Sequence, residues 1–114
     1  MAAEFLAEHG YPENLSNLVL ECIRYHHGGP AERSIESILL TDADALDLLG
    51  VAGTLKIFSM CPRDLLTARA AAQKYRDASV KAITTEKARE FAAKRIQETD
   101  DLLCLFEEET FGLY

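Results

Sequence analysis

The chain has 114 residues and a formal net charge of −7, with 48% hydrophobic and 27% charged residues. This length and balance predict one soluble globular domain over residues 1–114, because a chain of this size can bury about two thirds of its unfolded surface. The negative charge argues against a nucleic-acid backbone or an anionic membrane as partner, since both attract clustered lysine and arginine, but it is compatible with a small phosphorylated substrate held by a metal ion.

The terminus and the cysteines favour a cytoplasmic protein. The first residues include Glu4 and Glu8 and have no long apolar core, unlike a signal peptide. No apolar run approaches the ~18 residues that a membrane span requires. Cys22, Cys61 and Cys104 are far apart and odd in number, which favours three reduced core cysteines over a disulfide framework.

The first two expected helices contain the first candidate site residue. A short helix over Ala2–His9 is followed by a second from about Pro12 to His27, which Gly28 and the residues after it terminate. The second helix has an apolar stripe formed by Leu15, Leu18, Val19, Cys22 and Ile23. His26 continues this stripe and is expected to point inward, either as a satisfied core residue or as a metal ligand. His27 lies ~100° further round the helix and cannot easily share an ion with it.

A third helix is expected from Ser34, a good amino-terminal cap, to Leu49, with Gly50 as its stop. Its apolar stripe is formed by Ile35, Ile38, Leu39, Leu46 and Leu49, and its opposite face includes Leu40, Leu48 and Val51. A helix that is apolar on both sides is expected to be central and buried.

Three aspartates lie in this third helix. Asp42 interrupts the apolar stripe, and Asp44 and Asp47 share the opposite face at a spacing that lets both approach one site. Burying three acids is costly without a cation or hydrogen bonds. A solvated acidic face is the alternative, but the predicted burial favours a functional or metal-related role.

The rest of the chain is expected to be helical. Residues 51–61 continue as helix or form a short turn, residues 62–82 form an alanine-rich helix, and Thr84 or Thr85 caps a last helix that runs to about Glu109. Arg95 lies in the apolar stripe of that helix, where it either reaches solvent or neutralises a buried aspartate. No segment alternates as a strand does, so the fold is predicted to be all-α with about five helices. There is no nucleophile elbow, phosphate loop or dinucleotide fingerprint.

These segments together resemble the C-terminal half of an HD-domain metal-dependent phosphohydrolase. In that family a helix that ends in a histidine, here Ile23-Arg-Tyr-His26, precedes a helix with the pattern D-A-D-x-L-D-x-x-G, here Asp42-Ala-Asp44-Ala-Leu-Asp47-Leu-Leu-Gly50. The segment 5–11 is similar to the linker helix before them, and the segment 84–95 is similar to the family's T-x-x-A-R-x-x-A-x-x-R pattern. The resemblance covers most of the chain.

The resemblance implies an HD-domain-like helical bundle that hydrolyses phosphate esters, often nucleotides, with a divalent cation such as Mn, Mg, Co, Ni, Fe or Zn. The family holds its metal with a histidine, a His-Asp dipeptide and a later aspartate. That later aspartate corresponds best to Asp44, with Asp42 as the alternative. His26 would then face the substrate or a metal-bound water, Asp47 would orient it, and Asp42 could pair with Arg95.

The chain departs from the family pattern because it has no His-Asp dipeptide, and its histidines are His9, His26 and His27 only. Three of the four family ligands are therefore missing, and Asp44 with His26 cannot complete a site that activates water. Two hypotheses follow: a fragment of a phosphohydrolase that is inactive alone and whose His-Asp pair lies upstream, or a non-catalytic helical interaction module that retains an HD-fold remnant. The fragment hypothesis predicts exposure of Leu40 and Leu48, and with it self-association or poor solubility.

Overall fold

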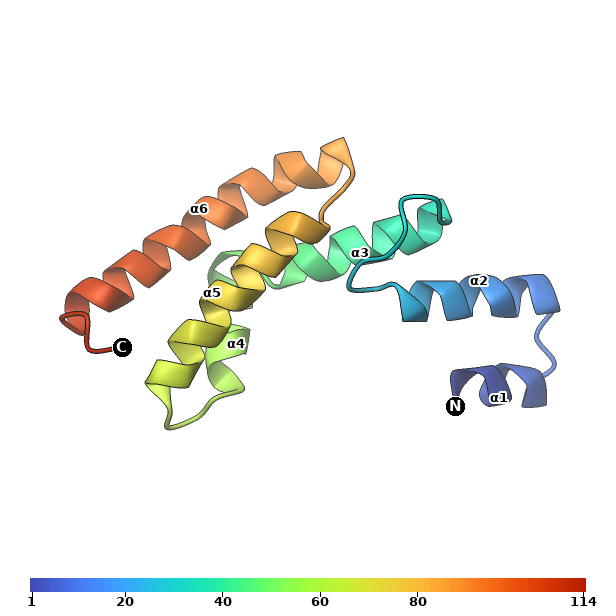
Figure 1. The fold of residues 1–114 in the computed structure, drawn as a ribbon, viewed down its shortest axis with the longest axis horizontal. Coiled ribbons are helices and arrows are strands. Elements are labelled where there is room, and N and C mark those ends of the chain that lie inside the picture. The colour runs from blue at the N-terminus through green and yellow to red at the C-terminus, as the bar shows by residue number, and fades with distance from the viewer.

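The structure, a computed structural model that describes residues 1–114, consists of six α-helices and no strands (Figure 1). The all-α class predicted from the sequence is confirmed. The helices are α1 (Ala2–Glu8), α2 (Glu13–Arg24), α3 (Ile35–Asp47), α4 (Gly50–Ser59), α5 (Leu65–Ala82) and α6 (Glu86–Glu109). There are six rather than about five because the residues after Leu49 form a helix of their own.

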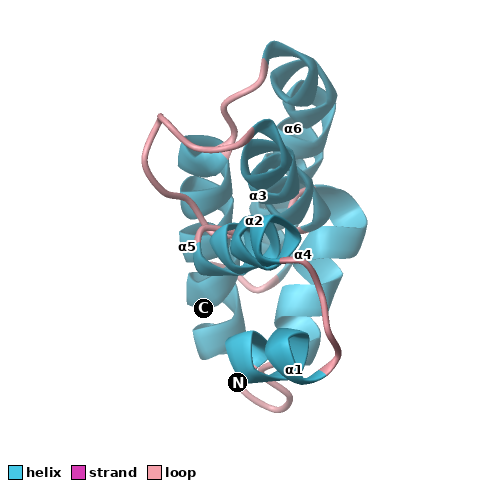
Figure 2. Cartoon of the chain, turned by 90° about the vertical axis from the view of Figure 1, so that its right-hand side faces the viewer, coloured by secondary structure: helices cyan, strands magenta, loops and turns pink.

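The helices form a body and an arm. α3 to α6 pack against one another, whereas α1 contacts only α2, and α2 otherwise contacts only α3. α1 and α2 therefore project from one end of the body (Figures 1 and 2). The radius of gyration is 17.2 Å, well above the roughly 13 Å of a compact chain of similar length. The arm accounts for this difference, and no residue of α2 is fully buried.

Two small apolar clusters hold the body together. The first joins α3, the end of α5 and α6 and consists of Ala45, Leu49, Ile83, Ala88 and Ala92. The second joins α4, α5 and α6 and consists of Ile57, Ala72 and Leu103. Many of these side chains are alanines, which let helix axes approach closely but bury little apolar area each. The stability of the body therefore depends also on polar contacts between its helices.

The buried face of α3 differs from the predicted one. Ile35 and Leu39 are 57% and 52% exposed, whereas Ser37, Thr41, Asp42 and Ala45 are buried. The hydroxyl of Thr41 donates to the carbonyl oxygen of Tyr25 at 2.7 Å and so ties the loop after α2 to the polar side of the helix. The prediction that α3 is buried on both sides is wrong for its first half, because no helix covers the apolar side there.

A tight corner joins α3 to α4. α3 ends at Asp47, two residues before the predicted end, and Gly50 begins α4 with φ +83°, a conformation that favours glycine. A Cβ atom on Gly53 would lie 2.4 Å from the carbonyl carbon of Leu48. Only glycine at position 53 lets α4 turn back so close to the end of α3.

Side-chain caps determine where the last two helices begin. α5 begins at Leu65, later than predicted, because the Asp64 side chain accepts a hydrogen bond from the Thr67 amide at 2.9 Å. α6 begins after Thr85, whose hydroxyl accepts from the Ala88 amide at 3.3 Å. Thr85 is one of the two caps predicted for this helix, and the structure selects it.

The helices and the cysteines bear on two of the sequence predictions. None of the helices combines the length and apolarity needed to cross a membrane. Cys22 and Cys61 are half-buried, but Cys104 is exposed, so Cys104 is not the core residue that was predicted. The nearby carboxylate of Glu108 raises the pKa of the Cys104 thiol.

Candidate functional site

Residues that the sequence marked as site candidates meet at a cavity between the loop after α2, α3 and α5. Its volume is about 280 Å³, and its polar groups include those of His26, His27, Thr41, Asp44, Lys74 and Tyr75. Leu48 and the alanines of α3 and α5 form its apolar wall. The cavity therefore brings His26 and Asp44 together, although they belong to separate segments of the chain.

Both adjacent histidines lie at this cavity, although the sequence placed them on different sides of one helix. α2 ends at Arg24, so His26 and His27 follow the helix rather than continue it. The separation of ~100° between successive helical side chains does not apply there. The two imidazole rings instead lie with their centroids 3.7 Å apart, inclined at 45°.

Hydrogen bonds assign the tautomer of each ring. The Nδ1 atom of His27 lies 3.0 Å from the Oδ2 atom of Asp44, and the Nδ1 atom of His26 lies 2.6 Å from the carbonyl oxygen of Ile23. A carboxylate and a carbonyl can only accept, so Nδ1 carries the hydrogen in both rings. In the neutral form of either ring the lone pair is then on Nε2, the arrangement usual for histidines that bind metals or protons.

Lys74 adds a positive charge to the cavity from α5. Its ammonium group forms no ion pair with any carboxylate of the chain. The site therefore combines one carboxylate, two imidazoles and one free ammonium. Nothing in the alanine-rich pattern of α5 marked Lys74 as a site residue, because its place at the cavity depends on how α5 packs against α3.

Asp42 lies away from this cavity. It is 2% exposed, and its carboxylate accepts hydrogen bonds from the amides of Thr84 at 2.8 Å and Thr85 at 3.0 Å. Burial raises the pKa of Asp42, but these hydrogen bonds and those of the two threonine hydroxyls outweigh it and hold the pKa below the usual value. Asp42 is a buried hydrogen-bonded anion that caps α6, and it does not pair with Arg95.

Asp47 and Arg95 also lie outside the cavity. The Oδ1 atom of Asp47 accepts from the Nζ atom of Lys56 at 2.7 Å, in an ion pair that is largely exposed. Arg95 is exposed and donates from Nη1 to the carbonyl oxygen of Leu46 at 2.8 Å. Its charge therefore complements the carboxyl end of α3 rather than an aspartate.

The described residues do not form a complete metal site. No three histidine, cysteine, aspartate or glutamate side chains are arranged to hold one ion. Asp44 and the two histidines supply ligand types that a divalent cation accepts, but Asp44 is hydrogen-bonded to His27. A metal at this cavity would need ligands besides these three side chains.

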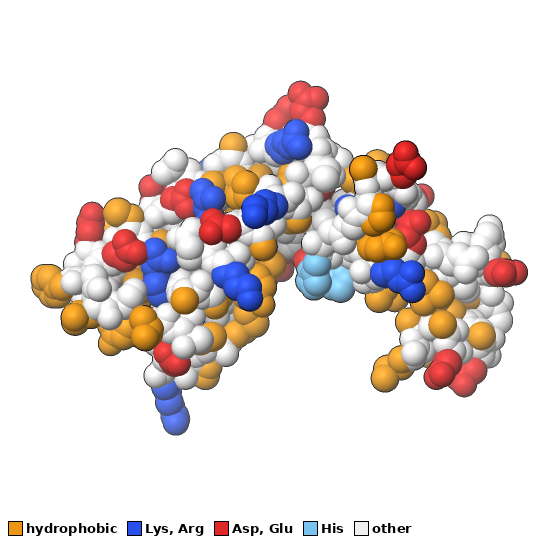
Figure 3. Space-filling view, viewed as in Figure 1, with side chains coloured by type: hydrophobic (Ala, Val, Ile, Leu, Met, Phe, Trp, Pro, Cys, Tyr) orange, Lys and Arg blue, Asp and Glu red, His pale blue; other side chains and the backbone are white.

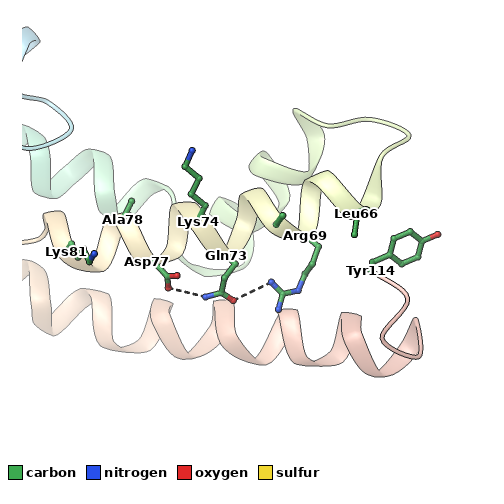
Figure 4. A pocket seen from close by; sticks show the side chains of 9 residues that line it. Leu66, Arg69, Gln73, Lys74, Asp77, Ala78, Lys81 and Tyr114 are labelled. Carbon is green, nitrogen blue, oxygen red and sulfur yellow. Dashed lines mark hydrogen bonds between the residues drawn. The ribbon is translucent and has the colours of Figure 1, made fainter.

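A larger groove of about 760 Å³ runs along α5 (Figure 4). Arg69, Gln73 and Asp77 line it and are hydrogen-bonded in series. Arg69 is also ion-paired with Glu107 of α6. Most of these polar groups are hydrogen-bonded within the chain, although the buried Nε atom of Arg69 has no partner. The smaller cavity is the stronger candidate because it brings together His26 and Asp44, which the sequence marks as site residues.

The cavity opens at the surface of the molecule. In Figure 3, histidine side chains are visible where the arm meets the body, beside the hollow that separates α1 and α2 from the remaining helices. His27 is largely exposed, and the side chain of Asp44 is about one third exposed. A ligand therefore has access to both.

Comparisons with known proteins do not extend this description. No family model, no curated protein and no solved structure matches the chain. The resemblance to HD-domain phosphohydrolases therefore depends on short segments of the sequence, chiefly residues 23–26, 42–50 and 84–95.

Proposed function

We propose that residues 1–114 supply one part of the active site of an HD-type metal-dependent phosphohydrolase that acts on phosphomonoesters or nucleotides. The observation that carries the proposal is the meeting of His26 and Asp44 at one cavity. Asp44 would be the carboxylate ligand of a divalent cation. The missing histidine and His-Asp pair would come from outside these 114 residues, so the segment alone is expected to be inactive.

The other cavity residues have roles consistent with this chemistry. The free Nε2 atom of His26 can accept a proton from, or donate one to, a substrate or a bound water. His27 holds the carboxylate of Asp44 through the 3.0 Å hydrogen bond. Lys74 supplies a positive charge that attracts a phosphate group. Asp47 is paired with Lys56 outside the cavity, so the proposal gives it no part in binding the metal or the substrate.

An uncovered surface beside the cavity supports the need for an additional segment. Leu40, one helical turn before Asp44 and on the same side of α3, is 43% exposed, whereas the exposed Ile35 and Leu39 lie on the opposite side of the helix. Leu48, by contrast, is half-buried against the second core cluster. A segment that covers this part of α3 would lie close enough to add ligands to the site.

The alternative proposal is a non-catalytic helical interaction module that retains an HD-fold remnant. The same exposed residues of α3 favour it, because a helix with Ile35, Leu39 and Leu40 at its surface can bind a partner without any chemistry. The absence of three metal-ligating side chains in one group is compatible with it. Under this alternative, a chain that includes upstream residues binds no metal at Asp44.

Metal analysis combined with a phosphatase screen distinguishes the two proposals. The 114-residue chain and an N-terminally extended chain are each dialysed against Mn²⁺, assayed for bound metal, and screened against nucleotides and a generic phosphomonoester. The phosphohydrolase proposal expects metal and activity in the extended chain only, and loss of both on Asp44→Asn. Asp47→Asn is the matched control and should change neither. Metal content that survives Asp44→Asn rejects the assignment of Asp44, and an extended chain without metal or activity favours the module.

A further inference from the structure

α6 has an exposed side that no other helix covers, the α6 stripe, in which two apolar side chains are separated by the charged residues Lys94, Glu98 and Asp101. Phe91 and Leu105 are 60% and 55% exposed. They are 14 residues apart, close to four turns of α-helix, so both lie on one side. The buried side of α6 is formed by Ala88, Ala92, Thr99 and Leu103. The stripe is thus a second face of the helix, distinct from the one that packs in the body.

The charges of α6 are unequally distributed along its length. Its basic residues all lie in the first ten positions, which also include Glu86 and Glu90 and so have a net charge of +2; the basic residues are Lys87, Arg89, Lys94 and Arg95. After Glu98 every charged residue is acidic, and these are Asp100, Asp101, Glu107, Glu108 and Glu109. A helix with this distribution is complementary to a second copy of itself that runs in the opposite direction.

Glu98 lies midway between Phe91 and Leu105, so we take it as the centre of such a pair. Residues equally far from Glu98 then face each other across the two helices. Phe91 of one copy then faces Leu105 of the other. Each pairing occurs twice because a two-fold axis relates the copies. The Glu98 carboxylates of the two copies would lie near each other at the centre. The Nζ atom of Lys94 lies 3.6 Å from the Oε1 atom of Glu98 and reduces the repulsion between these carboxylates.

The same register places Lys87 opposite Glu109. Both side chains are exposed and lie near the ends of α6. Opposite charges at the rim of an interface contribute to the choice and orientation of the partner. The two termini of the paired helices would therefore be held by ion pairs between copies.

A cavity next to Leu105 can accept an aromatic ring. It lies between α4 and α6, measures about 140 Å³, and is lined by Thr54, Leu55, Phe58, Leu102, Leu103 and Phe106. In the antiparallel register, Phe91 of the second copy lies within a turn of the α6 residues that line this cavity. Val51 and Leu55 of α4 are 47% and 57% exposed and extend the apolar surface beside it.

We infer that the α6 stripe and the adjoining edge of α4 form a two-fold symmetric homodimer interface, in which Phe91 of each copy fills the α4–α6 cavity of the other. Charge complementarity about Glu98 and the position of the cavity both select a second copy of this chain as the occupant. The interface does not involve His26 or Asp44, so it does not depend on the proposed function.

Sedimentation equilibrium of the full chain tests the inference. The wild-type chain is expected to dimerise. Phe91→Ala should raise the dissociation constant by about tenfold or more, as truncation of a buried aromatic anchor usually does. Phe111→Ala is the matched control, because Phe111 is 89% exposed but lies beyond the stripe. Circular dichroism checks that each variant keeps its helices.

A charge exchange tests the register. Lys87→Glu and Glu109→Lys should each weaken the dimer, and the double variant should recover much of the loss because the pair is restored with reversed sign. A monomeric wild-type chain at every concentration overturns the inference. A dimer that tolerates Phe91→Ala but is broken by Leu39→Glu overturns it as well, because association would then occur through α3.

Discussion

The carboxylate of Asp42 in α3 accepts hydrogen bonds from both the amide and the hydroxyl of Thr85, the residue that caps α6. The two residues are 43 positions apart in the sequence. The amides of Thr84 and Thr85 immediately precede α6, and here a side chain from a different helix accepts a hydrogen bond from each. The contact joins the beginning of α6 to the middle of α3.

Asp42→Ala is expected to destabilise the fold by about 2 kcal/mol, because the Thr84 and Thr85 amides then lose their charged acceptor in a partly buried place. Urea unfolding followed by circular dichroism measures the loss. Asp47→Ala serves as the comparison, since its exposed ion pair with Lys56 should be worth less than about 1 kcal/mol. Equal losses for the two variants would show that Asp42 is not a cap of this importance.

The fold should lose stability in acid through the same contact. The pKa of Asp42 is lowered in the folded chain, so its carboxylate stabilises the fold above the ordinary aspartate pKa of about 3.9 and ceases to do so as the pH falls through its folded pKa. The free energy of unfolding should therefore decline below about pH 4. The difference between wild type and Asp42→Asn should narrow over that range, and a difference that stays constant would argue against the ionised form as the source of stability.

Substitution of Gly53 at the corner between α3 and α4 should be more severe than substitution of Gly112 beyond α6. Gly53→Ala forces a Cβ atom to within 2.4 Å of backbone and should cost about 3 kcal/mol or more. Gly112→Ala provides the reference for backbone strain alone, since Gly112 has φ +70° and open space around it, with an expected cost of roughly 1 kcal/mol. Thermal unfolding of both variants gives the comparison, and a mild effect at Gly53 would contradict the tight corner.

Thr99 stabilises the same corner from α6. Its Oγ1 atom accepts a hydrogen bond from the buried Gly50 amide at 2.8 Å. Thr99→Val keeps the shape but removes the acceptor, which should cost about 2 kcal/mol. Thr110→Val removes a hydroxyl that only donates to backbone carbonyls at the end of α6 and should cost less than about 1 kcal/mol. Urea unfolding of the two variants in parallel tests the difference.

Local patterns were sufficient for the helices themselves. Apolar spacing and cap residues such as Thr85 act over a few positions, so they predict where a helix lies and near which residue it begins. The all-α class and most helix positions followed from them. Two helix ends were predicted less accurately. The second helix ends at Arg24 rather than at His27, because the residues after it form a loop, and the fifth begins at Leu65 rather than at residue 62, because Asp64 caps it.

The environments of Asp42, Asp44 and Asp47 could not be derived in this way. The three acids lie within one helix, yet Asp42 caps α6, Asp44 meets His27 at a cavity, and Asp47 pairs with Lys56 at the surface. Periodicity describes which residues share a face but not which neighbour that face meets. It also placed Ile35 and Leu39 inside, where the structure has Ser37 and Thr41 instead.

Sequence periodicity was thus enough to establish the helices and to mark α3 as the segment whose acids need partners. The tertiary structure decided the partner of each acid: Thr84 and Thr85, more than forty positions away, for Asp42; His27 of the loop after α2 for Asp44; and Lys56 of α4 for Asp47. Contacts between separate helices and loops depend on the assembled fold and leave no periodic signal in the chain.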